Sequence, residues 1–164
     1  MTDELFIKLY EQHKNSVYSV IFGYVRSEAD AADLTQETFI KLYSCGKDFE
    51  NSEHIKAWLL RCAINSCKNH LRDIKKHGHE ELDENIPAAP ETDYGDVMQA
   101  VLELPEKYRV VIHLFYYENY SVKQIAQALD VSENTAKTRL ARGRDKLKSR
   151  LEKEAEHYEY RFGI

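Results

Sequence analysis

The chain has 164 residues, with 23 Lys and Arg against 28 Asp and Glu and a formal net charge of −5. This length allows one large domain or two small ones. A chain with this overall charge is not expected to bind nucleic acid as a uniformly basic protein does. The content of 43% hydrophobic and 31% charged residues predicts a soluble globular protein, which excludes collagen-like, disordered and disulfide-scaffold classes.

The first residues, MTDELFIKLYEQHK, carry acids at Asp3 and Glu4 and lack the continuous apolar core of a signal peptide. Apolar runs elsewhere are far shorter than the roughly 20 residues that span a bilayer. The three cysteines cannot all pair with one another, which fits a reducing compartment. We therefore expect a cytoplasmic protein.

The charges are unevenly distributed along the chain. Residues 77–100 hold seven acids and no Lys or Arg, whereas residues 137–150 hold seven basic residues and one acid. The stretch 77–96 also contains two prolines and two glycines, so we expect a flexible acidic linker rather than a long loop within one domain. The predicted fold is all-α, with small helical domains at 1–76 and 97–164.

Residues 27–43 are expected to form a helix with Ser27 as N-cap. Ala31, Leu34, Thr38, Leu42 and Cys45 recur at helical spacing, so one face can pack inward. A neighbouring stripe carries Asp30, Asp33, Glu37 and Lys41. On spacing alone, such a stripe is more typical of a solvated face than of a binding face. Paired carboxylates can also serve acid–base catalysis, but no nucleophile or metal partner accompanies them.

Residues 55–72 are predicted to form a second amphipathic helix. Its apolar stripe consists of Leu60, Ile64, Cys67 and Leu71. A polar stripe lies one position later along the chain and consists of Arg61, Asn65, Lys68 and Arg72, with Asn69 beside it. Arg and Lys can contact phosphates and Asn can read exposed bases, although a solvated face explains the spacing equally well. Trp58 is expected in the core.

A zinc site is not expected. Cys62 and Cys67 form no C-x-x-C pair, and the nearby histidines, His70, His77 and His79, lack the spacing of a ligand set. We predict structural thiols, solvated histidines, and no metal or cofactor.

The C-terminal part carries the pattern of a helix-turn-helix. Pro105 can begin a buried helix, and Ser121 with Gln124 forms a capping box before a short amphipathic helix. Asp130 and Val131 interrupt the pattern, and Ser132 caps a second helix. Two short amphipathic helices across a tight turn are typical of this motif.

The second helix of this motif is strongly basic. Ala136, Leu140, Gly143 and Leu147 form its apolar stripe, which leaves on or near the outer surface Glu133, Asn134, Lys137, Thr138, Ala141, Arg142 and Arg144. An α-helix fits the major groove, where such side chains contact base edges, while Lys146, Lys148 and Arg150 would meet phosphates. The basic residues favour DNA binding over an ordinary helical hairpin.

In their order, these segments resemble the bacterial RNA polymerase sigma factors of the extracytoplasmic-function (ECF) type, in the sigma-70 family. DAADLTQETFIKLY at 30–43 is similar to the polymerase-binding helix of the family, and AWLLRCAINSCKNHLRD at 57–73 to its minus-ten element helix. Residues 104–148 are similar to its minus-thirty-five domain. The order of the three segments, with an acidic segment between the domains, is more specific than any one of them.

The resemblance implies three sets of site residues. The polymerase-binding set is Asp30, Asp33, Gln36, Glu37 and Phe39. The minus-ten set is Arg61, Asn65, Lys68, Asn69 and Arg72, in which the two Asn side chains would hold a flipped base of the melted non-template strand, in a pocket formed by residues 48–56. The upstream-element set is Lys137, Thr138, Arg139, Ala141, Arg142 and Arg144. Two departures limit what the resemblance implies. The basic cluster that often follows the minus-ten helix is reduced to Lys75 and Lys76, so phosphate contacts there are not implied. Ala141 is small where some relatives carry a larger side chain, so the resemblance does not imply which bases are read.

We therefore expect an initiation factor without catalytic activity or small-molecule substrate. Its partners would be core RNA polymerase, duplex promoter DNA and the melted strand. A membrane-anchored anti-sigma factor is implied by the resemblance alone. The alternative is a plain helix-turn-helix repressor or activator. A nucleotide-dependent enzyme would need a phosphate loop that the sequence lacks.

Overall fold

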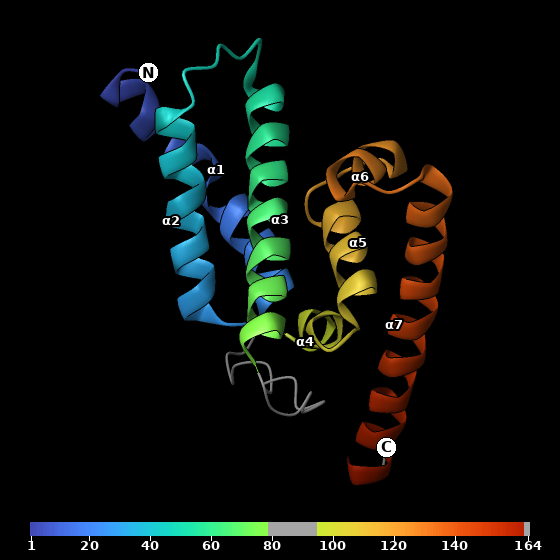
Figure 1. Ribbon diagram of the computed structural model, residues 1–164. Coiled ribbons are helices and arrows are strands. Elements are labelled where there is room, and N and C mark those ends of the chain that lie inside the picture. Colours follow the sequence, from blue (N-terminus) through green and yellow to red (C-terminus); the bar gives the residue numbers. More distant parts are fainter. Residues whose placement is uncertain (79–94, 163–164) are drawn as a thin grey trace. The chain divides into compact units, whose positions relative to one another are not determined.

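The computed structural model describes residues 1–78 and 95–162, and side chains up to residue 157. The regular elements in this part of the chain are seven α-helices, which confirms the all-α prediction. The chain divides into two compact units, Met1–Pro90 and Glu91–Ile164 (Figure 1). Most of the predicted acidic linker, residues 79–94, lies outside the described residues. The domain limits at 76 and 97 stay a prediction.

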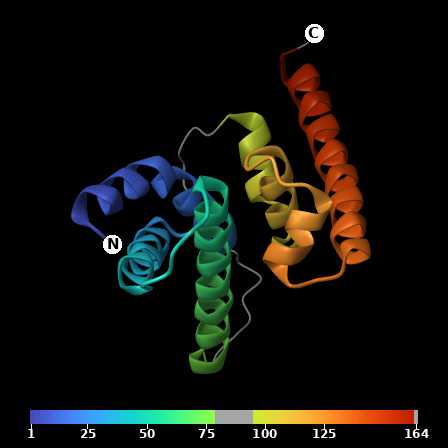
Figure 2. The ribbon, with the colours of Figure 1, turned by 90° about the horizontal axis from the view of Figure 1, so that it is seen from above.

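The N-terminal unit consists of α1 (Asp3–Val25), α2 (Glu28–Ser44) and α3 (Ser52–His77), and each of these helices packs against the other two (Figure 2). The residue before each helix is its N-cap, whose side chain accepts a backbone hydrogen bond. Thr2 accepts from the Leu5 N–H, Ser27 from the Asp30 N–H and Asn51 from the His54 N–H. These caps satisfy backbone donors that have no partner within the helix.

The core of this unit lies on the predicted apolar stripes. Ala31, Leu34, Thr38 and Leu42 of α2 and Leu60, Ile64 and Cys67 of α3 are all buried. Helix α3 is longer than the predicted 55–72. It begins at Ser52 because Asn51 caps it, and basic residues at 75–77 lie in its last turn, where positive charge complements the helix dipole.

The C-terminal unit consists of α4 (Asp96–Leu102), α5 (Glu106–Tyr116), α6 (Val122–Leu129) and α7 (Glu133–Phe162). Helix α7 packs against the other three. The predicted buried helix is α5, in which every residue from Tyr108 to Leu114 is buried. Helix α4 was not predicted, because its residues were assigned to the linker or left without an element.

Helices α6 and α7 form the predicted helix-turn-helix. Ser121 and Gln124 form both hydrogen bonds of the capping box, at 3.2 and 2.9 Å. Asp130 adopts the left-handed conformation, with φ of 56°, and ends α6. Ser132 then accepts a hydrogen bond from the Thr135 N–H at 3.1 Å. The turn thus sets the start of α7.

Gly143 allows α7 to approach α5 closely. A Cβ atom at this position would lie 3.1 Å from Cγ1 of Ile112 and 3.4 Å from Cβ of Tyr108. Both neighbours belong to the core cluster of this unit, with Val101, Leu104 and Leu140. The glycine therefore fixes how α7 lies on α5, and so which face of α7 is exposed.

Candidate functional site

The outer face of α7 is exposed as the sequence predicts. Ala136 and Leu140 are 1% and 3% exposed and face the core. The seven residues expected on the outside are all exposed: Glu133, Asn134, Lys137, Thr138, Ala141, Arg142 and Arg144. A helix-turn-helix that presents such a face can insert it into the major groove of duplex DNA.

Of two arginines on the borders of this face, Arg144 is held by α5. The Arg144 Nε donates a hydrogen bond to the hydroxyl of Tyr116 at 2.8 Å, and its Cζ lies 5.0 Å from the ring centroid of Phe115. Arg139 is half-buried and lines a hollow with Arg142 and with Lys107 of α5. The contacts with Tyr116 and Phe115 position the Arg144 side chain before any ligand binds.

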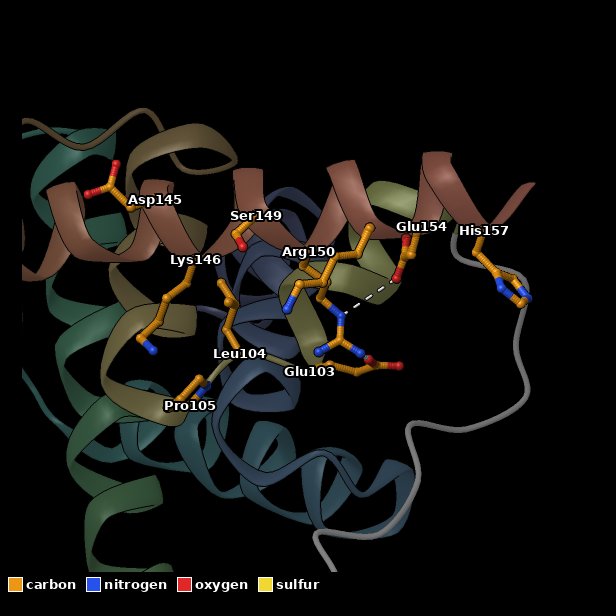
Figure 3. Close-up of a pocket in the computed structure, with 10 residues that line it drawn as sticks. Glu103, Leu104, Pro105, Asp145, Lys146, Ser149, Arg150, Glu154 and His157 are labelled. Carbon is orange, nitrogen blue, oxygen red and sulfur yellow. Dashed lines mark ion pairs between the residues drawn. The ribbon is translucent and has the colours of Figure 1, made fainter. Parts of the chain in front are cut away.

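Arg150 departs from the sequence prediction. It was expected to meet phosphates, but its guanidinium pairs with the carboxylate of Glu103 and lies 3.6 Å from that of Glu154 (Figure 3). These residues line a groove between the α4–α5 turn and the C-terminal half of α7. Because two carboxylates already neutralise Arg150, its contribution to phosphate binding is reduced. The run of positive charge on α7 that is free of acidic partners therefore ends before Arg150.

The polar stripe of α3 is exposed along its whole length, as the prediction requires. Its members are Arg61, Asn65, Lys68, Asn69 and Arg72. Arg72 donates a hydrogen bond to the side-chain oxygen of Asn69 at 3.1 Å. The face thus combines cations with two amides, a combination that suits contacts with phosphates and unpaired bases.

The segment before α3 packs on the predicted core tryptophan. Phe49 meets Trp58 edge to face, with ring centroids 5.6 Å apart, and the Lys47 ammonium lies 5.9 Å from the Trp58 ring. Trp58 is half-buried. The start of residues 48–56 is therefore held against α3 near the amide face.

On α2, the structure places three of the five predicted polymerase-binding residues, Asp33, Gln36 and Glu37, on an exposed surface. Asp30 is half-buried, and its carboxylate lies 3.4 Å from Nε2 of His70 on α3. The prediction that Phe39 belongs to this surface must be corrected. It is 2% exposed and packs with its ring 4.8 Å from that of Tyr10, so it supports this face from the core and cannot lie on it.

Ile40 is a surface residue that sequence reasoning missed. It is 64% exposed, and it lies at helical spacing from Asp33, Gln36 and Glu37. An exposed apolar side chain among polar ones is suited to a protein contact. The sequence does indicate this exposure, because Ile40 lies outside the apolar stripe of α2.

The faces of α2 and α3 are connected through Lys41. Its ammonium lies 2.6 Å from the Glu37 carboxylate and donates a hydrogen bond to the buried Ser66 hydroxyl of α3 at 2.8 Å. The Asp30–His70 contact forms a second link between the same helices. Among the described residues, no cluster of His, Cys, Asp and Glu could hold a metal ion.

The comparisons with known proteins cover both units. Residues 9–77 match the family model for sigma-70 region 2, and residues 94–147 match the model for sigma-70 region 4. RNA polymerase sigma factor SigV of Bacillus subtilis is 31% identical, over 93% of this chain and 95% of that protein. ECF RNA polymerase sigma factor SigW of the same species is 27% identical, over 90% and 89%.

A solved structure has the same fold. The sigma factor RpoE of Bartonella quintana, in complex with the anti-sigma factor NepR, matches with a TM-score of 0.71 over 90% of this chain and 96% of that one, at 21% identity. The predicted resemblance is confirmed by the two family models and by the relatives. This chain belongs to the sigma-70 family of RNA polymerase sigma factors, among relatives of the ECF type.

Proposed function

We propose that this chain is an alternative sigma factor that binds core RNA polymerase and directs transcription initiation from specific promoters. The observation that carries the proposal is the exposed basic face of α7 on a helix-turn-helix, in a chain whose other unit is a sigma-70 region 2. A plain repressor or activator would have no use for that first unit.

Each unit has its own task in this proposal. The exposed face of α2, with Asp33, Gln36, Glu37 and Ile40, binds core polymerase, and Asp30 at its border adds negative charge. The α3 face holds melted minus-ten DNA, because its amides can accept and donate hydrogen bonds to an unpaired base. The outer face of α7 recognises the upstream element as duplex.

The capture of an unpaired base explains how such a protein opens DNA without an energy source. A base held outside the stack offsets the free energy lost on unpairing. Asn65 is the central candidate for this contact, since it lies in the middle of the exposed face between Arg61 and Asn69. The protein needs no catalytic group for this step, and we assign it no enzymatic activity.

We further propose that an anti-sigma factor anchored in the membrane controls the protein. Support for an anti-sigma partner comes from the Bartonella quintana structure, in which a sigma factor is bound to an anti-sigma factor. The membrane anchor is implied only by the resemblance to the ECF type. No helix in the described part of this chain is long and apolar enough to cross a membrane. Affinity capture from detergent-solubilised membranes tests this proposal, and recovery of no membrane protein that blocks polymerase binding would contradict it.

Reconstitution tests the main proposal. Purified full-length protein and core polymerase are incubated with the promoter region upstream of its own gene, without any other sigma factor. We expect transcripts with one defined start site, and none with core polymerase alone. Tight binding of the protein to an operator, without binding to core polymerase, would instead establish the repressor alternative.

A further inference from the structure

A positively charged hollow lies on one flank of α7, beside the N-terminus of α5. It is lined by cations from both helices, Lys107 from α5 and Arg139 and Arg142 from α7. The remaining lining residues are uncharged: Tyr108, Asn134, Thr135 and Thr138. Three cations share this hollow without a carboxylate in its lining, so their mutual repulsion favours binding of an anion.

Tyr108 connects the cations of the two helices. Its ring is 7% exposed, and the ammonium groups of Lys107 and Lys146 lie 5.0 and 5.6 Å from its centroid. Desolvation would raise the pKa of Tyr108, but the charge of Lys107 and its hydrogen bond, together with those of Arg142, lower it. Tyr108 therefore lies beside both Lys107 and Arg142 in the lining of the hollow.

We propose that this hollow binds one backbone phosphate of the upstream-element DNA, with Lys107 and Arg142 as its charged contacts and Tyr108 as a positioning residue. The inference rests on the proposed function and adds to it a DNA contact from outside the helix-turn-helix. Arg and Lys are the side chains suited to phosphate oxygens. The N-terminus of α5, beside Lys107, adds the positive end of a helix dipole.

The position of the hollow relative to the outer face supports a backbone contact. Asn134, Thr138 and Arg142 line the hollow and also belong to the outer face, whereas the other wall comes from α5, so the hollow lies along the α5 border of that face. A helix in the major groove has base edges in front of it and phosphates at its flanks. The hollow therefore lies where a phosphate of one strand passes, and Arg142 serves affinity more than base choice.

The test uses holoenzyme, reconstituted from the full chain and core polymerase. The probe is duplex DNA with the upstream element of a promoter at which this holoenzyme starts transcription. Single phosphates are replaced in turn by uncharged methylphosphonate, and the dissociation constant is measured over a range of salt concentrations. We expect one replacement beside the element to weaken binding of the wild-type holoenzyme.

Lys107→Ala should reduce the slope of log affinity against log salt concentration by about one. It should weaken binding to all DNA sequences by the same factor. It should also remove the effect of that one methylphosphonate. Tyr108→Phe keeps the ring in the core and removes only the hydroxyl, so it should lower the same methylphosphonate effect without lowering the urea midpoint. The matched control is Lys153→Ala, which removes the same charge from the other groove of this unit.

If Lys107→Ala keeps the wild-type salt slope and methylphosphonate pattern, the hollow binds no phosphate. A change in base preference caused by Lys107→Ala would equally overturn the proposal. If the holoenzyme still initiates transcription, either of these results contradicts the phosphate site alone and leaves the proposed function intact. Failure of that function appears separately, as absence of transcripts in the reconstitution.

Discussion

The Tyr116 hydroxyl accepts a hydrogen bond from Nε of Arg144 at 2.8 Å, so the end of α5 holds an arginine of the recognition helix. Arg144 adjoins the buried stripe of α7, which contains Leu140 and Gly143, and so lies at the border of the outer face. We predict that Arg144 contacts the DNA backbone. Arg144→Ala should weaken holoenzyme binding to the native upstream element and to altered elements by the same factor.

Two variants check this assignment. Tyr116→Phe keeps the ring and removes the hydroxyl, so a smaller loss of affinity is expected, again without a change in sequence preference. Thr138→Ala, on the outer face, should instead change the ranking of altered elements, measured by competition among duplexes. If Arg144→Ala changed that ranking, Arg144 would be a base contact.

On the polymerase face, Asp33→Lys and Ile40→Ser should each weaken binding to core polymerase. The first reverses a charge on the proposed contact surface and the second removes its exposed apolar side chain. Asp33 is a cleaner choice than Glu37, because Glu37 pairs with Lys41 and reversal would disturb the link to α3. Affinity is measured by titrating labelled protein with core polymerase.

The control for this face is Asn15→Lys, which adds a positive charge at an exposed position of α1, outside the α2 surface. It should leave the affinity for core polymerase unchanged. An equal loss from all three variants would show that the effect comes from net charge or folding. The proposed surface would then be wrong.

Asn65→Ala should impair promoter opening while the affinity of the holoenzyme for closed duplex stays close to that of wild type. The side chain is exposed and supports no core contact, so the fold should not change. Permanganate reactivity of unpaired thymines measures opening, and a promoter with a premelted minus-ten region should restore transcription. Asn15→Ala, an exposed asparagine of α1, is the matched control. A loss of duplex affinity equal to the loss of opening would refute the assignment.

The helices and their exposed faces could be predicted because they depend on local signals. Ser27, Ser121 and Ser132 cap helices where the sequence places them, and the apolar stripes mark what is buried. Phe39 shows the limit of this reasoning. The family resemblance assigned it to a surface, but aromatic packing with α1 buries it, and contacts between helices far apart in sequence leave no local pattern.

The same limit applies to cations on the helix-turn-helix. The sequence separates Arg142 and Arg144, expected at base edges, from Arg150, expected at phosphates, only by their position along the helix. Their partners lie outside α7, namely Tyr108 and Tyr116 on α5 and Glu103 just after α4, and these partners give each arginine different surroundings. Lys107 was missed for a related reason. It lies far before the basic segment 137–150 in sequence, yet it lines the same hollow as Arg139 and Arg142 of that segment.

Gly143→Ala should lower the stability of the C-terminal unit. Alanine favours a helix over glycine by about 1 kcal/mol, but its Cβ would press on Ile112, which is 1% exposed and cannot move without disturbing the core. Overpacking of this kind costs about 1–3 kcal/mol, so a net loss is expected. Urea unfolding followed by circular dichroism measures it. The control is Ala141→Gly on the exposed side of α7, which measures the effect of helix propensity alone. If Gly143→Ala raised the free energy of unfolding, the close contact between α7 and α5 would be contradicted.

The N-terminal unit should lose stability as the pH falls below about 7, because of His13 on α1. Burial, and then the charge of Lys56, lower the pKa of His13 from its usual 6.5. Between the folded pKa and 6.5, the unfolded chain binds a proton that the folded chain does not, so the free energy of unfolding decreases with falling pH. The decrease from this residue is at most about 1.4 kcal/mol per pH unit in that interval.

Urea unfolding at pH 7.5 and at pH 5.5 measures this effect. Trp58 is the single tryptophan of the chain and lies in the N-terminal unit, so its fluorescence reports on that unit. His13→Gln should reduce the difference between the two pH values, since glutamine does not titrate. His54→Gln is the matched control, because His54 is exposed. If the wild type and His13→Gln lost equal stability on acidification, His13 would not be the group responsible.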